Sequence, residues 1–150
     1  MSDTNQFETL QLQHIFQNAS MPNIGDATGL PASATAGSLY LSLLSADPGE
    51  SGTSQATNEL SYTGYARIAI ARTSGAWTVS GNTASNAALA TFAACTAGSG
   101  TAAYWGLGTA ASGAGYLLLT GQVTTPSGGL SISAGVTPEF AIGALTYTKD

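Results

Sequence analysis

The period of the hydrophobic pattern changes along this chain, and that change limits the fold more than any other feature. After Gly37, apolar residues recur at every second position in short runs, as in SLYLSLLS at 38–45, and Gly, Ser, Asn and Thr separate the runs. A period of two places successive side chains on opposite faces of a strand. Runs that begin about ten residues apart are typical of a sandwich or a barrel. We therefore predict an all-β fold, a jelly-roll-like antiparallel β-sandwich, over residues 38–150.

The strands of this sandwich are expected to be short. The longest alternating segment is SYTGYARIAIAR at 61–72, and the others contain three to eight residues between Gly-rich or Asn-Thr turns. No repeat of fixed period is present, which argues against a β-helix, a solenoid or a fibrous shaft. The predicted strands cover residues 38–45, 61–72, 77–79, 87–92, 102–108, 116–123, 130–133 and 141–148.

The first 37 residues differ from the rest of the chain. A helix is predicted over residues 5–19, which contain no Gly or Pro, with Asp3 or Thr4 as the N-cap. The following segment, 21–37, is rich in Pro, Gly and small polar residues and is predicted to be an extended linker. We expect a division into an arm at 1–37 and a β-sandwich domain at 38–150. The helix either hangs from this linker or packs back on its own domain.

Charged residues make up only 7% of the chain, whereas an ordinary soluble domain carries about 25%. The cations are Arg67, Arg72 and Lys149, and the formal net charge is −5. An uncharged polar surface loses little solvation energy when another protein covers it, so we favour a protein that assembles with neighbours over a secreted domain with a polar coat. Nucleic acid is not an expected partner, because the sequence has no cationic patch for phosphates.

The N-terminus lacks the features of a signal peptide, and no stretch approaches the roughly 18 apolar residues that span a bilayer. No membrane contact is therefore expected, and synthesis is expected in a cytoplasm.

Residues for chemistry are scarce. His14 and Cys95 are the only residues of their kinds, so a Ser-His-Asp site, a Cys-His site, a disulfide within the chain and a zinc cluster are not expected. Cys95 lies in an apolar run and is predicted to be buried. Asp47, Glu50 and Glu59 share one loop region, but they lack the spacing of a calcium loop, and we interpret them as turn formers and solvated charges. We predict no catalytic residue, no cofactor and no metal.

Several segments together are more specific than any one of them. Their order is a leucine-rich strand with an Asp-Pro turn, a Gly-Tyr-Ala-Arg segment, an Asn-Thr segment, a Trp-Gly-Leu-Gly segment and a closing Phe-x-x-Gly-Ala-Leu segment. In this order they resemble a family of small phage virion proteins, variously labelled tail fibre protein and head decoration or cement protein. The turns after the second strand carry less charge here than in that family. The segments are LYLSLLSADPGESGT at 39–53, TGYARIAIAR at 63–72, GNTASNAALATF at 81–92, WGLGTAASGAGYLLLTG at 105–121 and VTPEFAIGALTYTKD at 136–150.

The resemblance implies a structural protein made in a bacterial cytoplasm and carried on the virion, with no enzymatic activity. Our leading hypothesis is a decoration protein on the exterior of the capsid, with the major capsid protein as its partner. A homodimer or homotrimer is also expected, because strands at a sandwich edge pair readily. Aromatic and aliphatic side chains dominate interface energetics, so one face of the helix is the predicted partner contact. This face comprises Phe7, Leu10, His14, Ile15 and Phe16.

Two other functions are kept open. A tail-associated or receptor-binding fibre module would stack carbohydrate on a group of aromatic residues, although a sandwich also needs such residues in its core. A hydrolase on a jelly-roll scaffold would use two of the carboxylates Asp47, Glu50 and Glu59 as acid and base. The aromatic residues that would stack carbohydrate in the fibre module are Tyr62, Tyr65, Tyr104, Trp105 and Tyr116.

Overall fold

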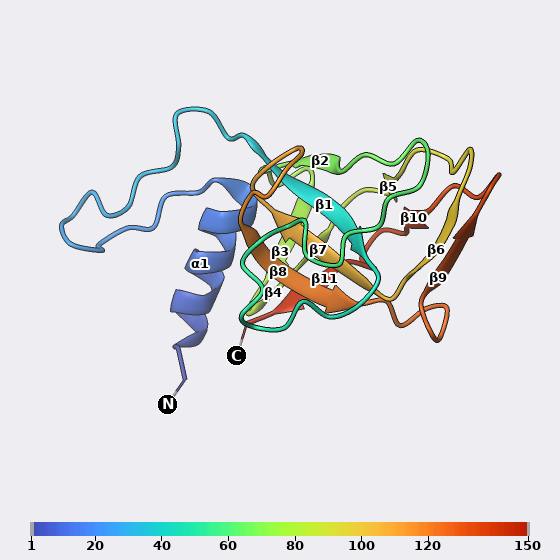
Figure 1. Cartoon of the computed structure of the whole chain (residues 1–150). Helices are drawn as coiled ribbons and strands as arrows, with labels where there is room; N and C mark the ends of the chain where they lie inside the picture. The colour runs from blue at the N-terminus through green and yellow to red at the C-terminus, as the bar shows by residue number, and fades with distance from the viewer. Residues whose placement is uncertain (1, 150) are drawn as a thin grey trace. The chain divides into compact units, whose positions relative to one another are not determined.

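The computed structural model describes residues 2–149 and consists mainly of β-strands, with one short helix near the N-terminus (Figure 1). Every strand pair whose register is defined is antiparallel. This confirms the predicted all-β class and agrees with a β-sandwich, whereas the jelly-roll order of strands stays a prediction. Among the described residues, none of the helical structure is long and apolar enough to cross a bilayer.

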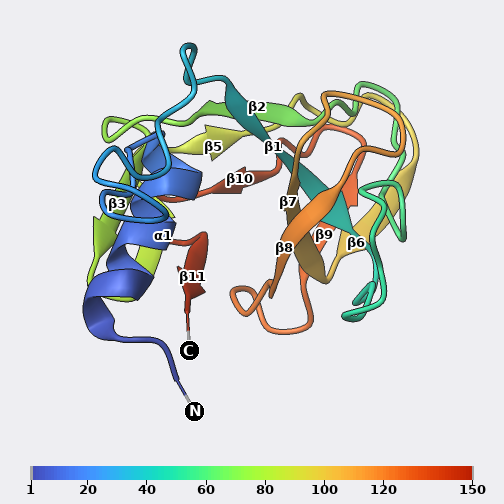
Figure 2. The same cartoon turned by 90° about the vertical axis from the view of Figure 1, so that its left-hand side faces the viewer.

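The chain forms two compact units, each built from segments that are distant in the sequence. Within the described residues, unit 1 comprises 2–38, 71–89 and 141–149, and unit 2 comprises 39–70 and 90–140. Unit 1 contains the helix and a three-stranded sheet of order β11-β4-β3. Its elements are α1 (Asn5–Gln17), β3 (Trp77–Ser80), β4 (Thr83–Asn86) and β11 (Thr146–Thr148). Figure 2 labels α1, β3 and β11 of this unit.

Local capping fixes both ends of α1. The Thr4 side chain is the N-cap and accepts a hydrogen bond from the backbone N of Phe7 at 3.4 Å. The chain leaves the helix at Asn18, whose φ of 53° lies in the left-handed region that Asn tolerates better than most residues. The predicted helix is therefore confirmed, with its end two residues earlier than expected.

The helix packs on the sheet of its own unit. Its buried face includes Leu12 and Phe16, and the Phe16 ring meets the Trp77 ring edge to face with the ring centres 4.7 Å apart. Gln17 donates a hydrogen bond to the carbonyl of Trp77 at 2.8 Å, and Thr9 donates one to Gly81 at 2.8 Å. Of the two arrangements that the sequence left open, the helix adopts the packed one.

The segment after α1 forms a loop that returns on itself. Met21 and Leu30 pair as an isolated antiparallel bridge, and the Asn18 side chain exchanges two hydrogen bonds of 2.9 Å with the backbone of Ser33. The predicted linker is thus irregular in structure, as its composition indicated, but it is pinned at these points.

Unit 2 contains a four-stranded sheet of order β2-β1-β7-β8 and two smaller strand pairs, β5 with β10 and β6 with β9. Strand β1 is buried on both faces, which explains why its sequence is apolar at nearly every position. The four-stranded sheet comprises β1 (Ser38–Leu44), β2 (Ile68–Ala71), β7 (Tyr104–Gly108) and β8 (Leu117–Gln122), whose terminal residues Ser38 and Ala71 are assigned to unit 1. The small pairs comprise β5 (Ala90–Thr91), β6 (Ser99–Ala102), β9 (Leu130–Ser133) and β10 (Glu139–Phe140).

The predicted strand at 61–72 is wrong over its first half. Tyr62 and Tyr65 flank a turn, closed by a hydrogen bond from Tyr65 N to Tyr62 O at 2.9 Å, and Gly64 has a φ of +100°. Glycine reaches this conformation without strain, so the alternation of aromatic residues here does not mark a strand. Only Ile68–Ala71 belongs to a strand.

Other strand predictions vary in success. Those at 38–45, 77–79, 116–123 and 130–133 are confirmed to within about one or two residues, which is the usual uncertainty of strand ends. The prediction at 102–108 spans the end of β6 and all of β7. The predictions at 87–92 and 141–148 are too long, since only Ala90–Thr91 and Thr146–Thr148 form strands there. The pattern does not predict β4 or β10, and it predicts only the last residue of β6.

Candidate functional site

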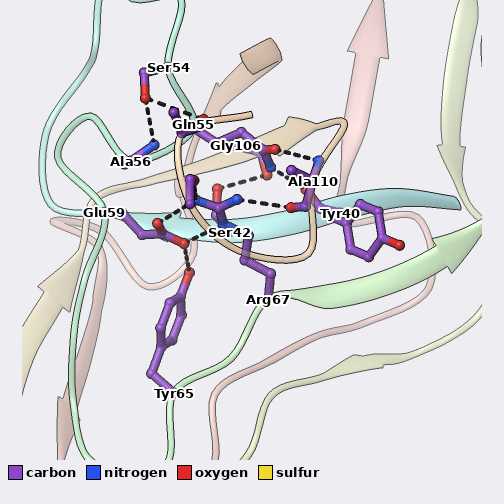
Figure 3. Close-up of polar contacts among 12 residues, drawn as sticks. Tyr40, Ser42, Ser54, Gln55, Ala56, Glu59, Tyr65, Arg67, Gly106 and Ala110 are labelled. Carbon is purple, nitrogen blue, oxygen red and sulfur yellow. Dashed lines mark hydrogen bonds and ion pairs between the residues drawn. The ribbon is translucent and has the colours of Figure 1, made fainter. Parts of the chain in front are cut away.

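The most ordered polar cluster lies in unit 2, where Arg67 and Glu59 form a bidentate ion pair (Figure 3). The Nε and Nη2 atoms of Arg67 each donate to a different oxygen of Glu59, and both distances are 2.7 Å. The Arg67 side chain is 3% exposed and the Glu59 side chain 16%. A planar guanidinium matches a carboxylate in this geometry, which makes the pair both strong and directional.

Tyr65 completes the acidic side of this cluster. Its hydroxyl donates to the Oε1 atom of Glu59 at 2.7 Å and accepts from the backbone N of Leu43 at 3.2 Å. Burial, reinforced by the hydrogen bond to Glu59, raises the pKa of Tyr65 above its ordinary value. The hydrogen bond to Glu59 likewise raises the pKa of Arg67. Both groups are thereby held in the protonated forms that this network requires.

The same cluster braces an exposed loop at 109–116. Arg67 Nη1 donates to the carbonyl of Ala110 at 2.9 Å, and Nη2 donates to the carbonyl of Gly113 at 2.7 Å. The fully buried Gln55 accepts from Ala110 N at 2.9 Å and donates to Tyr40 O at 3.1 Å. A Cβ at position 108 would collide with the Gln55 side chain, so glycine is required at that position.

This arrangement is suited to holding a surface in shape rather than to catalysis. The Glu59 carboxylate is occupied by Arg67 and Tyr65, and four N–H groups of Arg67 are used within the protein. A general acid or base needs a free position near a substrate, which these atoms do not offer. The cluster therefore acts as a scaffold for the loop at 109–116.

The braced loop leads into an uncharged strand edge. Strand β8 is the last strand of its sheet, and its burial alternates between half-buried and exposed positions. Tyr116 is 72% exposed and Leu118 45% exposed. Thr53 accepts from the backbone N of Leu117 at 2.9 Å, whereas Leu118–Gln122 make no backbone hydrogen bonds to described residues other than those with β7. An edge with free backbone groups and apolar side chains is a template for strand pairing.

All Lys and Arg side chains of the protein are engaged within their own unit. Arg67 binds Glu59, Lys149 binds Asp3 at 3.0 Å, and Arg72 binds three backbone carbonyls of unit 1. Two of these carbonyls, Ile15 at 2.7 Å and His14 at 2.6 Å, lie in the last turn of α1, where a cation also complements the helix dipole. In addition, residues 73–138 contain no Asp, Glu, Lys, Arg or His. A partner therefore meets a surface that presents few charges.

The predicted partner-contact face of α1 is only partly accessible. Ile15 is 38% exposed, and Phe7, Leu10 and His14 are half-buried. The His14 Nδ1 atom lies 2.7 Å from the carbonyl oxygen of Ala19 and donates to it. Phe16 is 1% exposed because it packs against Trp77, so it holds the helix on its sheet and is not available to a partner in this conformation. That the remaining four residues contact a partner stays a prediction.

The aromatic residues proposed for carbohydrate stacking do not form a common surface. Tyr62 and Trp105 are buried, and Tyr65 is half-buried in the polar cluster. The ring centres of Tyr65 and Phe92 are 6.0 Å apart, which places Tyr65 in the aromatic core of unit 2. Tyr104 is half-buried, and Tyr116 alone of this set is exposed. Most of these residues therefore serve the core.

The acidic residues of the 47–59 region have separate roles. Asp47 accepts from Gly49 N at 2.9 Å in a turn, Glu50 is exposed, and Glu59 is bound to Arg67. In the part of the chain that the structure describes, no three His, Cys, Asp or Glu side chains are grouped as metal ligands. Cys95 is buried, as predicted, with its sulfur 3.4 Å from the carbonyl oxygen of Ala97.

Sequence reasoning missed the link between Glu59 and the Gly-Tyr-Ala-Arg segment. The alternating pattern predicts a strand that includes Tyr65 and Arg67, and the loop position of Glu59 predicts a solvated charge. The available signal was chemical: a chain with so few cations rarely leaves an Arg in an apolar segment without a carboxylate nearby.

Comparison with known proteins adds a family to these observations. The family model described as Podophage GP4 fiber I protein gp80 matches residues 6–148. No curated protein matches the chain.

Proposed function

The chain belongs to the podophage GP4 fiber I protein gp80 family, and from this premise we propose that it is a non-enzymatic structural subunit of a phage virion that assembles with other proteins in a fibre. The observation that carries the proposal is the engagement of every Lys and Arg side chain inside the protein, together with the charge-free stretch at 73–138. Such a surface loses little solvation energy when it is covered, as assembly requires.

The family name favours the fibre over the head decoration role that the sequence suggested first. The decoration role, with the major capsid protein as partner, rests on the same uncharged surface but has no observation of its own. It is therefore the principal competing outcome of the localisation experiment below. A receptor-binding role through several stacked aromatic residues is weakened by the burial of Tyr62 and Trp105.

We further propose that copies of the chain associate through β8. Its outer edge offers backbone groups for pairing, and the segment carries no charge that would repel an identical strand. Two copies related by a two-fold axis would continue their sheets antiparallel to each other, with Leu118 in the contact. The braced loop at 109–116 would flank this contact and limit its register.

Localisation on the virion tests the main proposal. Fab fragments raised against the purified protein and conjugated to gold are applied to intact phage particles, and the particles are imaged. Label confined to fibres or to the tail is the expected result. Label distributed over the head would establish the decoration role instead, and absence of the protein from purified virions would refute both.

A reconstitution experiment tests assembly directly. Phage lacking this gene product is mixed with the purified protein, and occupancy is measured after sedimentation of the particles. The wild-type protein should rebind at a fixed number of copies. The Leu118→Lys variant should rebind at lower occupancy if β8 takes part, and Leu89→Lys serves as the matched control because Leu89 is also exposed, at 54%.

A further inference from the structure

We propose that a small pocket beside the first turns of α1 binds an arginine or lysine side chain of a second virion protein, with Glu8 as the residue that receives it. The pocket lies wholly within unit 1, between the helix and the β3–β4 turn. Its volume is about 210 Å³, and it is lined by Asn5, Glu8, Gly81 and Asn82. This site is distinct from the β8 edge, and its chemistry is the same in a fibre and in a head assembly.

Glu8 is the unusual residue of this pocket. It is only 6% exposed, yet within residues 2–149 its carboxylate accepts no hydrogen bond. The carboxylate oxygens are not themselves fully buried, so they reach water through the pocket, and a cation that enters the pocket would replace this water. The pocket gives an external group access to this carboxylate.

Two of the neighbouring residues, Gly81 and Asn82, already form hydrogen bonds within the protein. The carbonyl of Gly81 accepts from Thr9 Oγ1 at 2.8 Å. The Asn82 side chain donates to the carbonyl of Lys149 at 2.9 Å and accepts from Thr83 Oγ1 at 3.3 Å. Among the described residues the Asn5 side chain forms no hydrogen bond, so the free capacity of the pocket is that of the Glu8 carboxylate and the Asn5 amide, and the negative charge of Glu8 favours a ligand that donates hydrogen bonds.

The local charge calls for a cationic donor. Lys149 is the nearby cation, and its Nζ atom binds Asp3 at 3.0 Å. The hydrogen bond to Asp3 is the main cause of the raised pKa of Lys149, and Glu8 adds only through its charge. Lys149 is thus paired with Asp3, and no described residue forms an ion pair with Glu8, so the negative charge of Glu8 remains at the pocket. A guanidinium can bind a carboxylate through two parallel hydrogen bonds, and an ammonium can bind it as a point charge.

The donor is expected from a different protein rather than from a second copy of this chain. All three Lys and Arg side chains of this chain are bound within their own unit, and each would have to abandon its partners to reach Glu8 of another copy. A basic residue of a different protein could bind Glu8 without breaking any contact within this chain. The proposal relies on the assembly role for the identity of the partner, but the pocket can be tested without the partner.

The test uses Nα-acetyl-L-arginine methyl ester as the probe, because its guanidinium is its only cation. Backbone amide shifts of residues 5–9 and 81–82 are followed by NMR during titration of the full-length protein. The corresponding citrulline ester is the uncharged control, and glucose represents a neutral hydroxyl-bearing ligand. We expect saturable shifts with the arginine probe, and at least about tenfold weaker binding for the citrulline ester, as loss of a charge-assisted hydrogen bond predicts.

The variant Glu8→Gln keeps the shape of the side chain and removes its charge. It should weaken binding of the arginine probe about tenfold or more, whereas Glu139→Gln, which removes an exposed carboxylate of unit 2, should not. Absence of shifts with the arginine probe, or equal shifts in wild type and Glu8→Gln, overturns the proposal. Preferential binding of glucose would also overturn it and would identify a carbohydrate pocket.

Discussion

The guanidinium of Arg67 and the carboxylate of Glu59 are joined by two hydrogen bonds of 2.7 Å, and the same guanidinium holds the carbonyls of Ala110 and Gly113. One side chain therefore connects the end of the 45–60 loop to the exposed loop at 109–116. The shape of this surface therefore depends on Arg67.

Replacing Arg67 by Met should destabilise the protein by about 3–5 kcal/mol, because the change leaves the largely buried Glu59 without its counter-ion. Urea unfolding monitored by circular dichroism measures this loss. The exposed substitution Glu139→Gln should stay within about 0.5 kcal/mol of wild type. A loss below about 1 kcal/mol for Arg67→Met would mean that the pair behaves as an ordinary surface ion pair.

Because of Tyr65, the free energy of unfolding should decrease as the pH rises in the alkaline range. Burial and the bond to Glu59 raise its pKa in the folded state, so above about pH 10 the unfolded chain loses this proton while the folded protein keeps it. Its contribution is complete below that pH and declines as the pH rises further, by up to about 1.4 kcal/mol per pH unit. Urea unfolding at a series of alkaline pH values measures the slope.

The slope should be smaller in Tyr65→Phe and unchanged in Tyr116→Phe, which removes a hydroxyl from an exposed ring. Some slope should remain in Tyr65→Phe, because burial also raises the pKa of Tyr62. Equal slopes in wild type and Tyr65→Phe would contradict the assignment.

Phe16 is expected to be required for docking of α1. Phe16→Ala should cost about 3–5 kcal/mol, since it leaves a cavity against the ring of Trp77. Near-UV circular dichroism of the indole reports the change in its surroundings. Ile15→Ala, one position away but 38% exposed, is the control and should cost less than about 1 kcal/mol. Similar losses for the two variants would show that the helix is not anchored through Phe16.

Asn86 should be essential to the closing turn of the chain. Its buried amide donates to the carbonyls of Ala88 and Ala141 at 2.7 and 2.9 Å, and its oxygen accepts from Leu145 N at 2.9 Å. Asn86→Ala should lower the free energy of unfolding by about 1–3 kcal/mol, because the backbone N–H of Leu145 is left buried without a partner. Amide hydrogen exchange at Leu145 should become faster. Gln6→Ala, at an exposed amide of α1, should have little effect on either measurement.

Self-association through β8 should depend on concentration and on Leu118. Sedimentation velocity should show the wild type forming oligomers as its concentration rises, and Leu118→Lys should remain monomeric because charges would face each other across the strand pair. Leu89→Lys should behave as the wild type. A wild type that is monomeric at every concentration would rule out this contact.

The parts of the fold that the sequence predicted are those in which side-chain pattern and burial coincide. Strand β1 carries large apolar residues at buried positions and was located to within one residue. Strands β4 and β6 have the sequences TASN and SGTA, whose small residues form strands only because neighbouring strands pair with them. Their positions were therefore not recoverable from local pattern.

The polar cluster was harder to predict for a related reason. Glu59 and Arg67 are eight residues apart, and the turn at Gly64 brings them together. The alternating pattern across that turn predicts a continuous strand. In a continuous strand the chain does not turn back, so Arg67 would not lie beside Glu59. The helix, by contrast, depends on local capping and spacing, and its position was predicted closely.

Unit 1 is built from segments that are far apart in the sequence, and this affects the order of folding during synthesis. Strand β4 pairs with β3, which precedes it closely, and with β11, which lies at 146–148. The hydrogen bond between the Asn86 side chain and the backbone N of Leu145 likewise cannot form until Leu145 has been translated. Residues 39–70 of unit 2 are translated before β3, and residues 90–140 between β4 and β11, so all of unit 2 has left the ribosome before the sheet under α1 can be completed. Until then, the sheet against which Phe16 packs has only two of its three strands, β3 and β4. A nascent chain that stalls before β11 emerges would leave this sheet incomplete and its apolar face exposed.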